Sequence, residues 1–375
     1  MSGAVPTALA AEPRTARVQP RLFRGALLLP AAVALLAGLD AALVLLGLPA
    51  PVRAERLPDV HGMLLVFGFV GTLISLERAV ALKRRAGFLA PGLLGGGGLL
   101  LVSPAPLVVG QWTQLLGAVA LLAVCIPLWR RQRDDAQLVQ TFAAVLAIGG
   151  LALWLGGVEV SHLLPWLVGF IVATIGGERL ELARIAMGPT AGRTLLILSA
   201  AMVGGVVVSL LWPAAGYPLL GLTLLALVAW LARHDIARRT IRTSGLTRFM
   251  AANMLAGYFW LAVAGGAWAI GGPAYDGERY DVVIHGVFIG FTISMIMAHA
   301  PVILPAILRR PLHYRSALIG PAVLLHASLL LRLWVGDGLG VHFAWQTGGA
   351  LNIVALLGFI VLAAWSAARP RQARS

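Results

Sequence analysis

Long apolar blocks without charge are the feature that most constrains what this chain can fold into. Residues 195–212 and 353–365 carry no charged side chain, and only 12 % of all residues are charged, against about a quarter in soluble domains. A helix needs about 20 apolar residues to cross the hydrocarbon core of a bilayer, whereas the strands of a membrane barrel alternate apolar and polar residues. The sequence therefore predicts an all-α integral membrane protein.

Prolines, glycines and charge clusters divide the apolar residues into about twelve transmembrane helices. The predicted spans are 25–49, 58–82, 87–109, 111–129, 137–157, 161–183, 194–212, 216–232, 249–271, 281–308, 316–336 and 340–367. No cleavable signal peptide is expected, because residues 1–20 lack an apolar core. Residues 1–24 are interpreted as a disordered cytoplasmic tail, and residues 368–375 as a second cytoplasmic tail.

The basic residues indicate how these spans are oriented, because short cytoplasmic loops of membrane proteins are enriched in Lys and Arg. Placing both termini and every second loop in the cytoplasm collects 23 of the 29 basic residues there, and leaves only Arg53, Arg56 and Arg279 in the opposite loops. The remaining three, Arg78, Arg179 and Arg332, fall inside predicted spans. We therefore expect a multi-pass protein of the cell inner membrane with both termini in the cytoplasm.

The distribution of the basic residues also indicates whether the chain contacts a membrane or a nucleic acid. The formal net charge is +14, but the basic residues punctuate the apolar blocks and do not form one basic domain. We therefore expect contact with the lipid bilayer and no nucleic-acid binding. The single cysteine, Cys125, excludes an internal disulfide, and the chain has no P-loop, G-x-S-x-G or H-E-x-x-H motif.

Three segments repeat one pattern at the second, sixth and tenth predicted spans. His61 precedes Gly68-Phe69 by seven residues, His162 precedes Gly169-Phe170 by seven, and His285 precedes Gly290-Phe291 by five. Nine residues after each glycine stand Glu77, Glu178 and His299. The chain is therefore interpreted as three four-helix pseudo-repeats, at residues 25–129, 137–232 and 249–367, with a functional site expected at their common interface.

The histidines suggest a metal or haem site near the outer surface. Imidazole is an axial ligand of haem iron and also suits copper, and His61 and His285 form the best pair because a small glycine follows each of them. His162 occupies the matching place in the middle repeat, where it could bind a second metal or a haem propionate. The alternative is that these polar residues simply prefer the membrane–water boundary.

A second set of polar residues lies deeper in the predicted spans. Asp40, Glu77, Glu178 and His299 are candidates for a proton or ion path, because buried ionisable groups in membranes usually face the bundle interior and serve a function. His299 is also a candidate cofactor-binding residue. The alternative for Glu77-Arg78 and Glu178-Arg179 is pairing of sequence neighbours, with each arginine reaching toward the surface.

With its histidines on helices 2, 6 and 10, this layout resembles the catalytic subunit of the haem–copper oxidases. It more closely resembles the NnrS family of haem- and copper-containing membrane proteins linked to nitric oxide stress. Residues 61–64 and 67–69 are similar to the family's early His-x-His-Glu-Met-Leu-Phe-Gly-Phe stretch, and residues 298–301 are similar to its late helix with a histidine. Asp59 stands where that family has its first histidine, Gly62 replaces its glutamate, and the seventh span lacks the paired copper histidines of the oxidases.

This resemblance implies that the protein binds a haem cofactor, with copper as a second metal of the family. It also implies that the protein interacts with a redox partner or with nitric oxide. The first hypothesis is a haem-binding membrane protein that handles nitric oxide or redox stress. The second hypothesis is a transporter of a small solute or protons that uses the intramembrane glutamates and histidines. The third is a structural subunit with neither activity.

Overall fold

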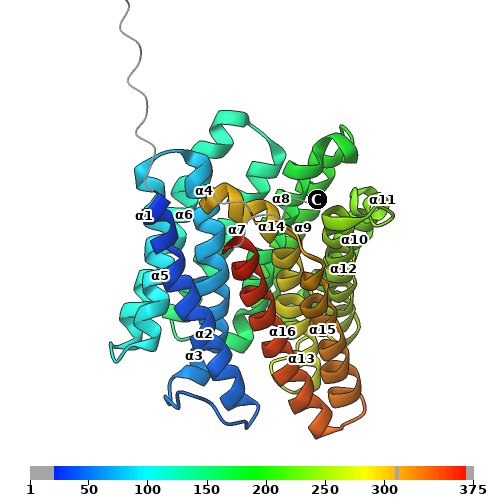
Figure 1. The fold of residues 1–375 in the computed structure, drawn as a ribbon. Coiled ribbons are helices and arrows are strands. Elements are labelled where there is room, and N and C mark those ends of the chain that lie inside the picture. The colour runs from blue at the N-terminus through cyan, green and yellow to red at the C-terminus, as the bar shows by residue number, and fades with distance from the viewer. Residues whose placement is uncertain (1–20, 309–311, 369–375) are drawn as a thin grey trace, which may run out of the picture.

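The computed structural model describes residues 21–308 and 312–368, and in these ranges the chain forms helices and no strands (Figure 1). Twelve helical segments are long and apolar enough to cross a membrane. Spans 1 to 12 are Phe23–Leu45, Leu57–Leu82, Arg85–Val102, Leu107–Gln132, Asp135–Leu155, Val160–Met187, Ala191–Leu211, Pro213–His234, Gly245–Gly271, Gly277–Pro305, Ser316–Asp337 and His342–Ala368. The predicted all-α polytopic fold is thus confirmed.

Individual helices divide some of these spans. The elements are α1 (Arg21–Ala26), α2 (Leu28–Leu45), α3 (Leu57–Met63), η1 (Leu64–Gly71), α4 (Thr72–Leu82), η2 (Arg85–Phe88), α5 (Leu89–Val102), α6 (Leu107–Gln132), α7 (Asp135–Leu155), η3 (Val160–Leu163), α8 (Leu164–Met187), α9 (Ala191–Leu211), α10 (Pro213–His234), α11 (Ala237–Thr240), α12 (Gly245–Gly271), α13 (Gly277–His285), η4 (Gly286–Ile293), α14 (Ser294–Leu308), η5 (Ser316–Leu318), α15 (Ile319–Leu330), η6 (Leu331–Asp337) and α16 (His342–Ala368). Of these, η1, η4 and η6 are π-helical.

Several predicted boundaries differ from the structure by a few residues, and two of them concern a tail and a proline-rich connection. Helix α1 begins at Arg21, inside the range expected to be a tail, whereas residues 1–20 and 369–375 of the expected tails lie outside the described residues. The third span ends at Val102 and not at 109, because the next residues are Ser103-Pro104-Ala105-Pro106. Proline disfavours helical backbone at the residue before it, so this apolar segment cannot continue as one helix.

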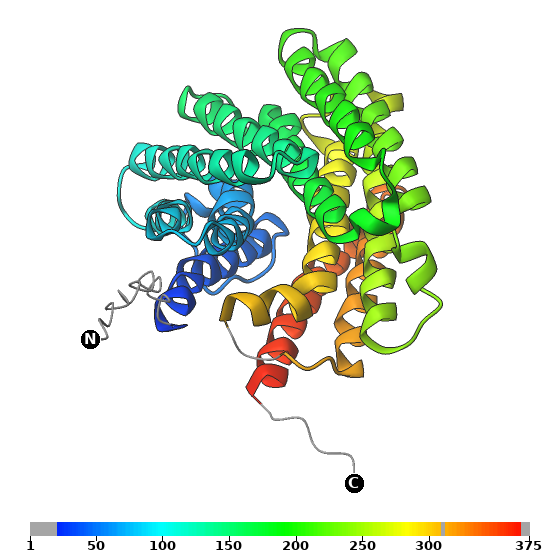
Figure 2. The same cartoon turned by 90° about the horizontal axis from the view of Figure 1, so that it is seen from above.

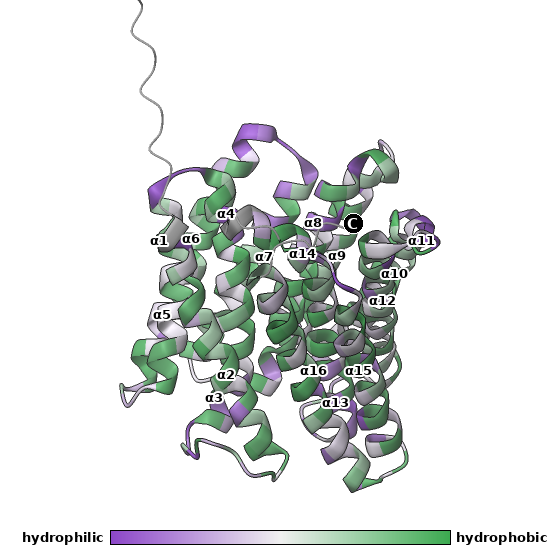
Figure 3. Cartoon of the chain, viewed as in Figure 1, coloured by the Kyte–Doolittle hydropathy of each residue, from purple (hydrophilic) through white to green (hydrophobic). Residues whose placement is uncertain are grey.

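The polar residues lie at the two ends of the bundle, and the hydrophobic residues lie between them (Figure 3). We call one end the arginine-rich end, because it carries the connections with Lys83, Arg130 and Arg238. The opposite end is called the histidine end, because spans 2, 6 and 10 begin there and carry His61, His162 and His285 near their beginnings. The polar ends and the apolar middle of the bundle correspond to the charge clusters and apolar runs from which the spans were predicted.

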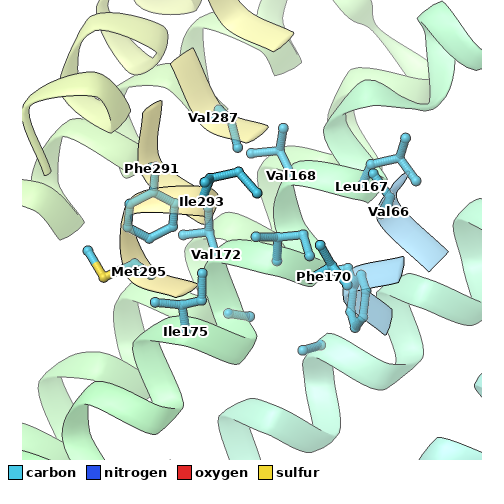
Figure 4. Packing of buried hydrophobic residues seen from close by; sticks show 14 of the residues in the cluster. Val66, Leu167, Val168, Phe170, Val172, Ile175, Val287, Phe291, Ile293 and Met295 are labelled. Atoms are coloured by element: carbon cyan, nitrogen blue, oxygen red, sulfur yellow. The ribbon is translucent and has the colours of Figure 1, made fainter. Parts of the chain in front are cut away.

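Spans 2, 6 and 10 occupy the interior of the bundle, as the repeat predicts. In their apolar windows 72 %, 78 % and 67 % of the residues are buried, against 50 % or less in every other span. Their side chains interlock: the rings of Phe67 and Phe170 stack with centroids 5.5 Å apart, and Phe170, Phe291 and Met295 belong to one packed cluster (Figure 4). Figure 2 shows the remaining helices arranged around this interior.

Glycines set how closely these central helices approach their neighbours. A methyl group added at Gly68 would lie 2.9 Å from Ala34 Cβ, one at Gly169 would lie 2.8 Å from Leu146, and one at Gly290 would lie 2.3 Å from Trp260. In each case the neighbour belongs to the first span of the same predicted four-helix unit. Small residues at such contacts matter in a bilayer, where helix association depends on close packing and not on removal of apolar surface from water.

Candidate functional site

His61 and His285 line the same cavity at the histidine end. The cavity has a volume of about 100 Å³, and its other polar lining residues include Tyr280, Arg332 and Asn352. Apolar side chains of spans 1, 2, 6, 10 and 12 form most of its wall. The structure therefore brings together the two histidines that the sequence selected as a ligand pair.

The ring of each of these histidines is held through its Nδ1 atom. His61 Nδ1 lies 2.8 Å from the carbonyl oxygen of Gly38, to which it donates a hydrogen bond in the tautomer that this contact requires. His285 Nδ1 lies 2.9 Å from the Asp281 carboxylate and 3.2 Å from the Asp281 carbonyl oxygen. Nε2 remains as the second nitrogen of each ring. Histidines that bind metals are usually oriented in this way, with the other ring nitrogen bonded to a carbonyl or carboxylate oxygen.

The Asp281 carboxylate is itself fixed by an arginine from span 11. The guanidinium of Arg332 donates two hydrogen bonds of 2.8 Å, one to each carboxylate oxygen of Asp281. The side chain of Arg332 is 9 % exposed and its guanidinium lies 5.0 Å from the centre of the Trp345 ring. The sequence did not predict this contact across 51 residues, although an arginine inside a predicted span was a signal that it needed a buried partner.

The backbone conformation next to His61 and His285 differs from that next to His162. The π-helical segment η1 begins three residues after His61, and η4 begins directly after His285, whereas His162 is followed by the regular helix α8. Short π-helical segments inside α-helices are frequent at functional sites. The His162 side chain is 48 % exposed and stacks on Tyr275 with ring centroids 4.1 Å apart, and it does not line the cavity of His61 and His285.

A larger cavity of about 540 Å³ lies toward the arginine-rich end. Three of the four residues predicted for a proton or ion path, Glu77, Glu178 and His299, line it together with Arg179. Its wall is otherwise mainly apolar, and Leu35, Phe69, Val70, Thr292, Ile293 and Leu356 line both cavities. The two cavities therefore adjoin each other within the membrane.

Asp40, the fourth predicted path residue, lies elsewhere. It stands near the end of α2, where its Oδ1 atom accepts a hydrogen bond of 3.1 Å from the backbone N–H of Val52. Neither cavity is lined by Asp40. This hydrogen bond holds the connection between spans 1 and 2 against the end of α2 at the histidine end.

Arg78 is the centre of a cluster of carboxylates between spans 2 and 6. It lies 2.7 Å from Glu77, 3.1 Å from Glu181 and 4.0 Å from Glu178, and donates a further hydrogen bond of 2.7 Å to Gln140. The predicted pairing of Glu77 with Arg78 is present. The part of that alternative in which Arg78 reaches toward the surface does not hold, because its side chain is only 6 % exposed and bonds to residues of α7 and α8.

Arg179 belongs to a second network. It donates hydrogen bonds of 2.9 and 3.0 Å to the Asp235 carboxylate, and its NH1 donates one of 2.8 Å to His299 Nε2. The hydroxyl of Tyr258 donates to the same carboxylate at 2.8 Å. The alternative that Arg179 pairs with its neighbour Glu178 therefore does not hold, since Arg179 bonds to Asp235, 56 residues away.

His299 uses both ring nitrogens within this network. Its Nδ1 lies 2.8 Å from the carbonyl oxygen of Met295, and its Nε2 accepts the hydrogen bond from Arg179. In this arrangement His299 links spans 6 and 10, and neither nitrogen is left to bind a cofactor. The sequence placed His299 at the correct depth but gave no indication of this partner.

The donor set at the histidine end suits a cofactor that needs two protein ligands. Among residues 21–308 and 312–368, no three His, Cys, Asp or Glu side chains come together as a metal-binding group. Two imidazoles with free Nε2 atoms on one cavity match the axial ligands of a haem iron. The adjoining cavity extends the available space, since about 100 Å³ alone is below the roughly 300–1,000 Å³ of typical ligand pockets.

Comparison with known proteins identifies a family but no characterised relative. A family model described as a domain of unknown function (DUF8744) matches residues 24–368. No curated protein and no solved structure matches this chain. The family match begins in span 1 and ends in span 12, and the chain therefore belongs to the DUF8744 family.

Proposed function

We propose that this protein binds haem within the membrane, with His61 and His285 as the two axial ligands, and that it acts in the handling of nitric oxide or redox stress. One observation carries the proposal: the two imidazoles line one cavity, and each is held through Nδ1 by a protein oxygen. When bound, the haem would supply an iron able to exchange electrons or to meet a small gas such as nitric oxide. No copper ligand is assigned.

The space around the two histidines limits how the haem can lie. The cavity next to them is about 100 Å³, and the cavity that adjoins it is about 540 Å³. Phe69 and Thr292 line both cavities, so a haem held by His61 and His285 would draw on the space of both. Arg332 and Tyr280 line the cavity at the histidine end and would supply polar contacts to it.

An optical spectrum of the purified full-length protein tests this proposal. We expect a Soret band at stoichiometric intensity with low-spin features, and each of His61→Ala and His285→Ala should give a high-spin spectrum or loss of haem, because each removes one strong ligand. His162→Ala is the matched control, because this histidine occupies the equivalent repeat position but lies outside the cavity. A colourless protein after expression with ample haem would refute the proposal, as would an unchanged low-spin spectrum in the double variant.

A transporter of a small solute or protons is the second candidate. The observation that favours it is the larger cavity, where Glu77 and Glu178 meet mainly apolar side chains deep in the bundle. Groups of this kind mark ion and proton pathways in membrane proteins. Proton-coupled uptake into vesicles that Glu178→Gln abolishes, by a protein without haem, would favour this candidate over the first.

We further propose that the protein resides in the cell inner membrane with both termini in the cytoplasm. The support is the distribution of 23 basic residues against three, together with twelve spans, an even number that returns the chain to its starting side. The arginine-rich end would then be cytoplasmic, and the pair His61 and His285 would lie toward the outer surface.

A further inference from the structure

The larger cavity combines an apolar wall with the carboxyl groups of Glu77 and Glu178, which belong to a cluster that contains more carboxyls than cations. Three carboxylates, those of Glu77, Glu178 and Glu181, surround the single guanidinium of Arg78. Arg179 does not balance them, because it is paired with the Asp235 carboxylate. Ionising a third carboxyl group beside one guanidinium is costly in the membrane interior, so a cation that enters this cavity would stabilise the ionised form of the carboxyl group that it meets.

Glu178 is the carboxylate that such a ligand would meet. Glu181 accepts hydrogen bonds from Arg78, Gln137 and Gln140, and Glu77 accepts one of 2.7 Å from Arg78. Glu178 has its nearest recorded cation at 4.0 Å and accepts no hydrogen bond from the described residues. Its side chain is 18 % exposed and lines the cavity.

The position of the cavity indicates a route from the lipid. Spans 1 and 12 meet at the histidine end, where Gln346 donates a hydrogen bond of 2.9 Å to the carbonyl oxygen of Leu46. Toward the arginine-rich end both spans line the larger cavity, and Ala32, Ile360 and Ala364 line it while also being exposed on the protein surface.

We propose that this cavity binds a lipophilic organic cation, which enters from the bilayer between α2 and α16 and places its positive charge against Glu178. The volume of about 540 Å³ is that of a typical pocket for a drug-sized molecule. The apolar wall contacts the body of the ligand, and the carboxylate cluster selects its charge. Neither His61 nor His285 lines this cavity, so cation binding is measured on protein without haem, and its failure leaves the haem proposal untouched.

Equilibrium binding to the purified full-length protein in lipid nanodiscs tests the charge requirement. The probe is tetraphenylphosphonium, and the comparison is neutral triphenylphosphine oxide. We expect saturable binding of one cation per protein and clearly weaker binding of the neutral compound. Glu178→Gln should weaken cation binding about 30-fold or more, because loss of a buried charge partner in an interface costs about 2 kcal/mol or more. Glu159→Gln is the control, since that side chain is 81 % exposed at the histidine end.

A second pair of variants tests the route without touching the carboxylates. Ile360→Trp places a larger side chain at the cavity mouth, whereas Val361→Trp adds the same side chain on the neighbouring exposed position, which does not line the cavity. We expect slower and weaker cation binding for the first variant only, with both eluting as folded protein in size-exclusion chromatography. Absence of cation binding in the natural protein, equal affinity for the neutral compound, or indifference to both Glu178→Gln and Ile360→Trp would overturn the proposal.

Discussion

The ion pair between Arg179 and Asp235 gives a prediction about stability that the structure makes quantitative. Both side chains are buried, at 5 % and 1 % exposure, and two hydrogen bonds of 2.9 and 3.0 Å join them. Asp235→Asn keeps the shape of the side chain but leaves the arginine charge unpaired. We expect a loss of roughly 3–5 kcal/mol in the free energy of unfolding, the usual cost of removing one partner of a buried pair.

A double-mutant cycle separates this cost from the net value of the pair. Arg179→Met alone leaves the Asp235 carboxylate with only the Tyr258 hydroxyl and the Ala237 N–H as donors, so it should also cost roughly 3–5 kcal/mol. The double variant carries no unpaired buried charge and should be clearly more stable than the sum of the single effects indicates. A coupling of roughly 2–3 kcal/mol, at the upper end for residues in contact, is expected.

Denaturant titration of the purified protein in mixed micelles, followed by tryptophan fluorescence, measures these differences. Glu159→Gln is the control, because Glu159 forms a pair with His162 in which the two side chains are 81 % and 48 % exposed, and exposed pairs contribute roughly 0–1 kcal/mol. If Asp235→Asn cost no more than Glu159→Gln, or if the two single effects simply added, the assignment of a buried structural ion pair would be refuted.

Two further predictions concern packing and topology. Gly290→Ala should destabilise the protein by roughly 1–3 kcal/mol through overpacking, because the added methyl group would lie 2.3 Å from Trp260; Gly266→Ala, with open space around it, should show no such loss in the same unfolding assay. Reporter fusions at Ser375 and near Asp276 should report opposite sides of the membrane, and identical locations would contradict the twelve-span topology.

The local pattern of the sequence was sufficient to predict the fold class and most of the spans. The length of an apolar run and the arginines between the runs are features of about twenty consecutive residues, so they can be recognised without knowledge of tertiary contacts. The repeat could also be predicted from the sequence, because Gly68, Gly169 and Gly290 have the same sequence spacing to Glu77, Glu178 and His299. The main local error, the end of the third span, came from underrating the prolines after Val102.

The candidate site could be predicted only in part. The sequence selected His61 and His285, and the structure places both on one cavity. It gave His162 the matching place in the middle repeat, and the structure leaves that ring half exposed, stacked on Tyr275 and outside the cavity. π-helical segments follow the first two histidines and not His162, and residue spacing alone does not reveal such a difference in the backbone.

The sequence alone thus determined how many times the chain crosses the membrane and which helices carry polar groups. The tertiary structure decided which of those groups meet. Arg179 bonds to Asp235 and not to the adjacent Glu178, and Arg332 bonds to Asp281. The physical reason is geometric: neighbouring residues on a helix point about 100° apart, so pairing with a sequence neighbour is not assured. Arg78 bonds to its neighbour Glu77 and also to Glu181 on another helix, and only the packing of the helices determines which distant partner a buried charge meets.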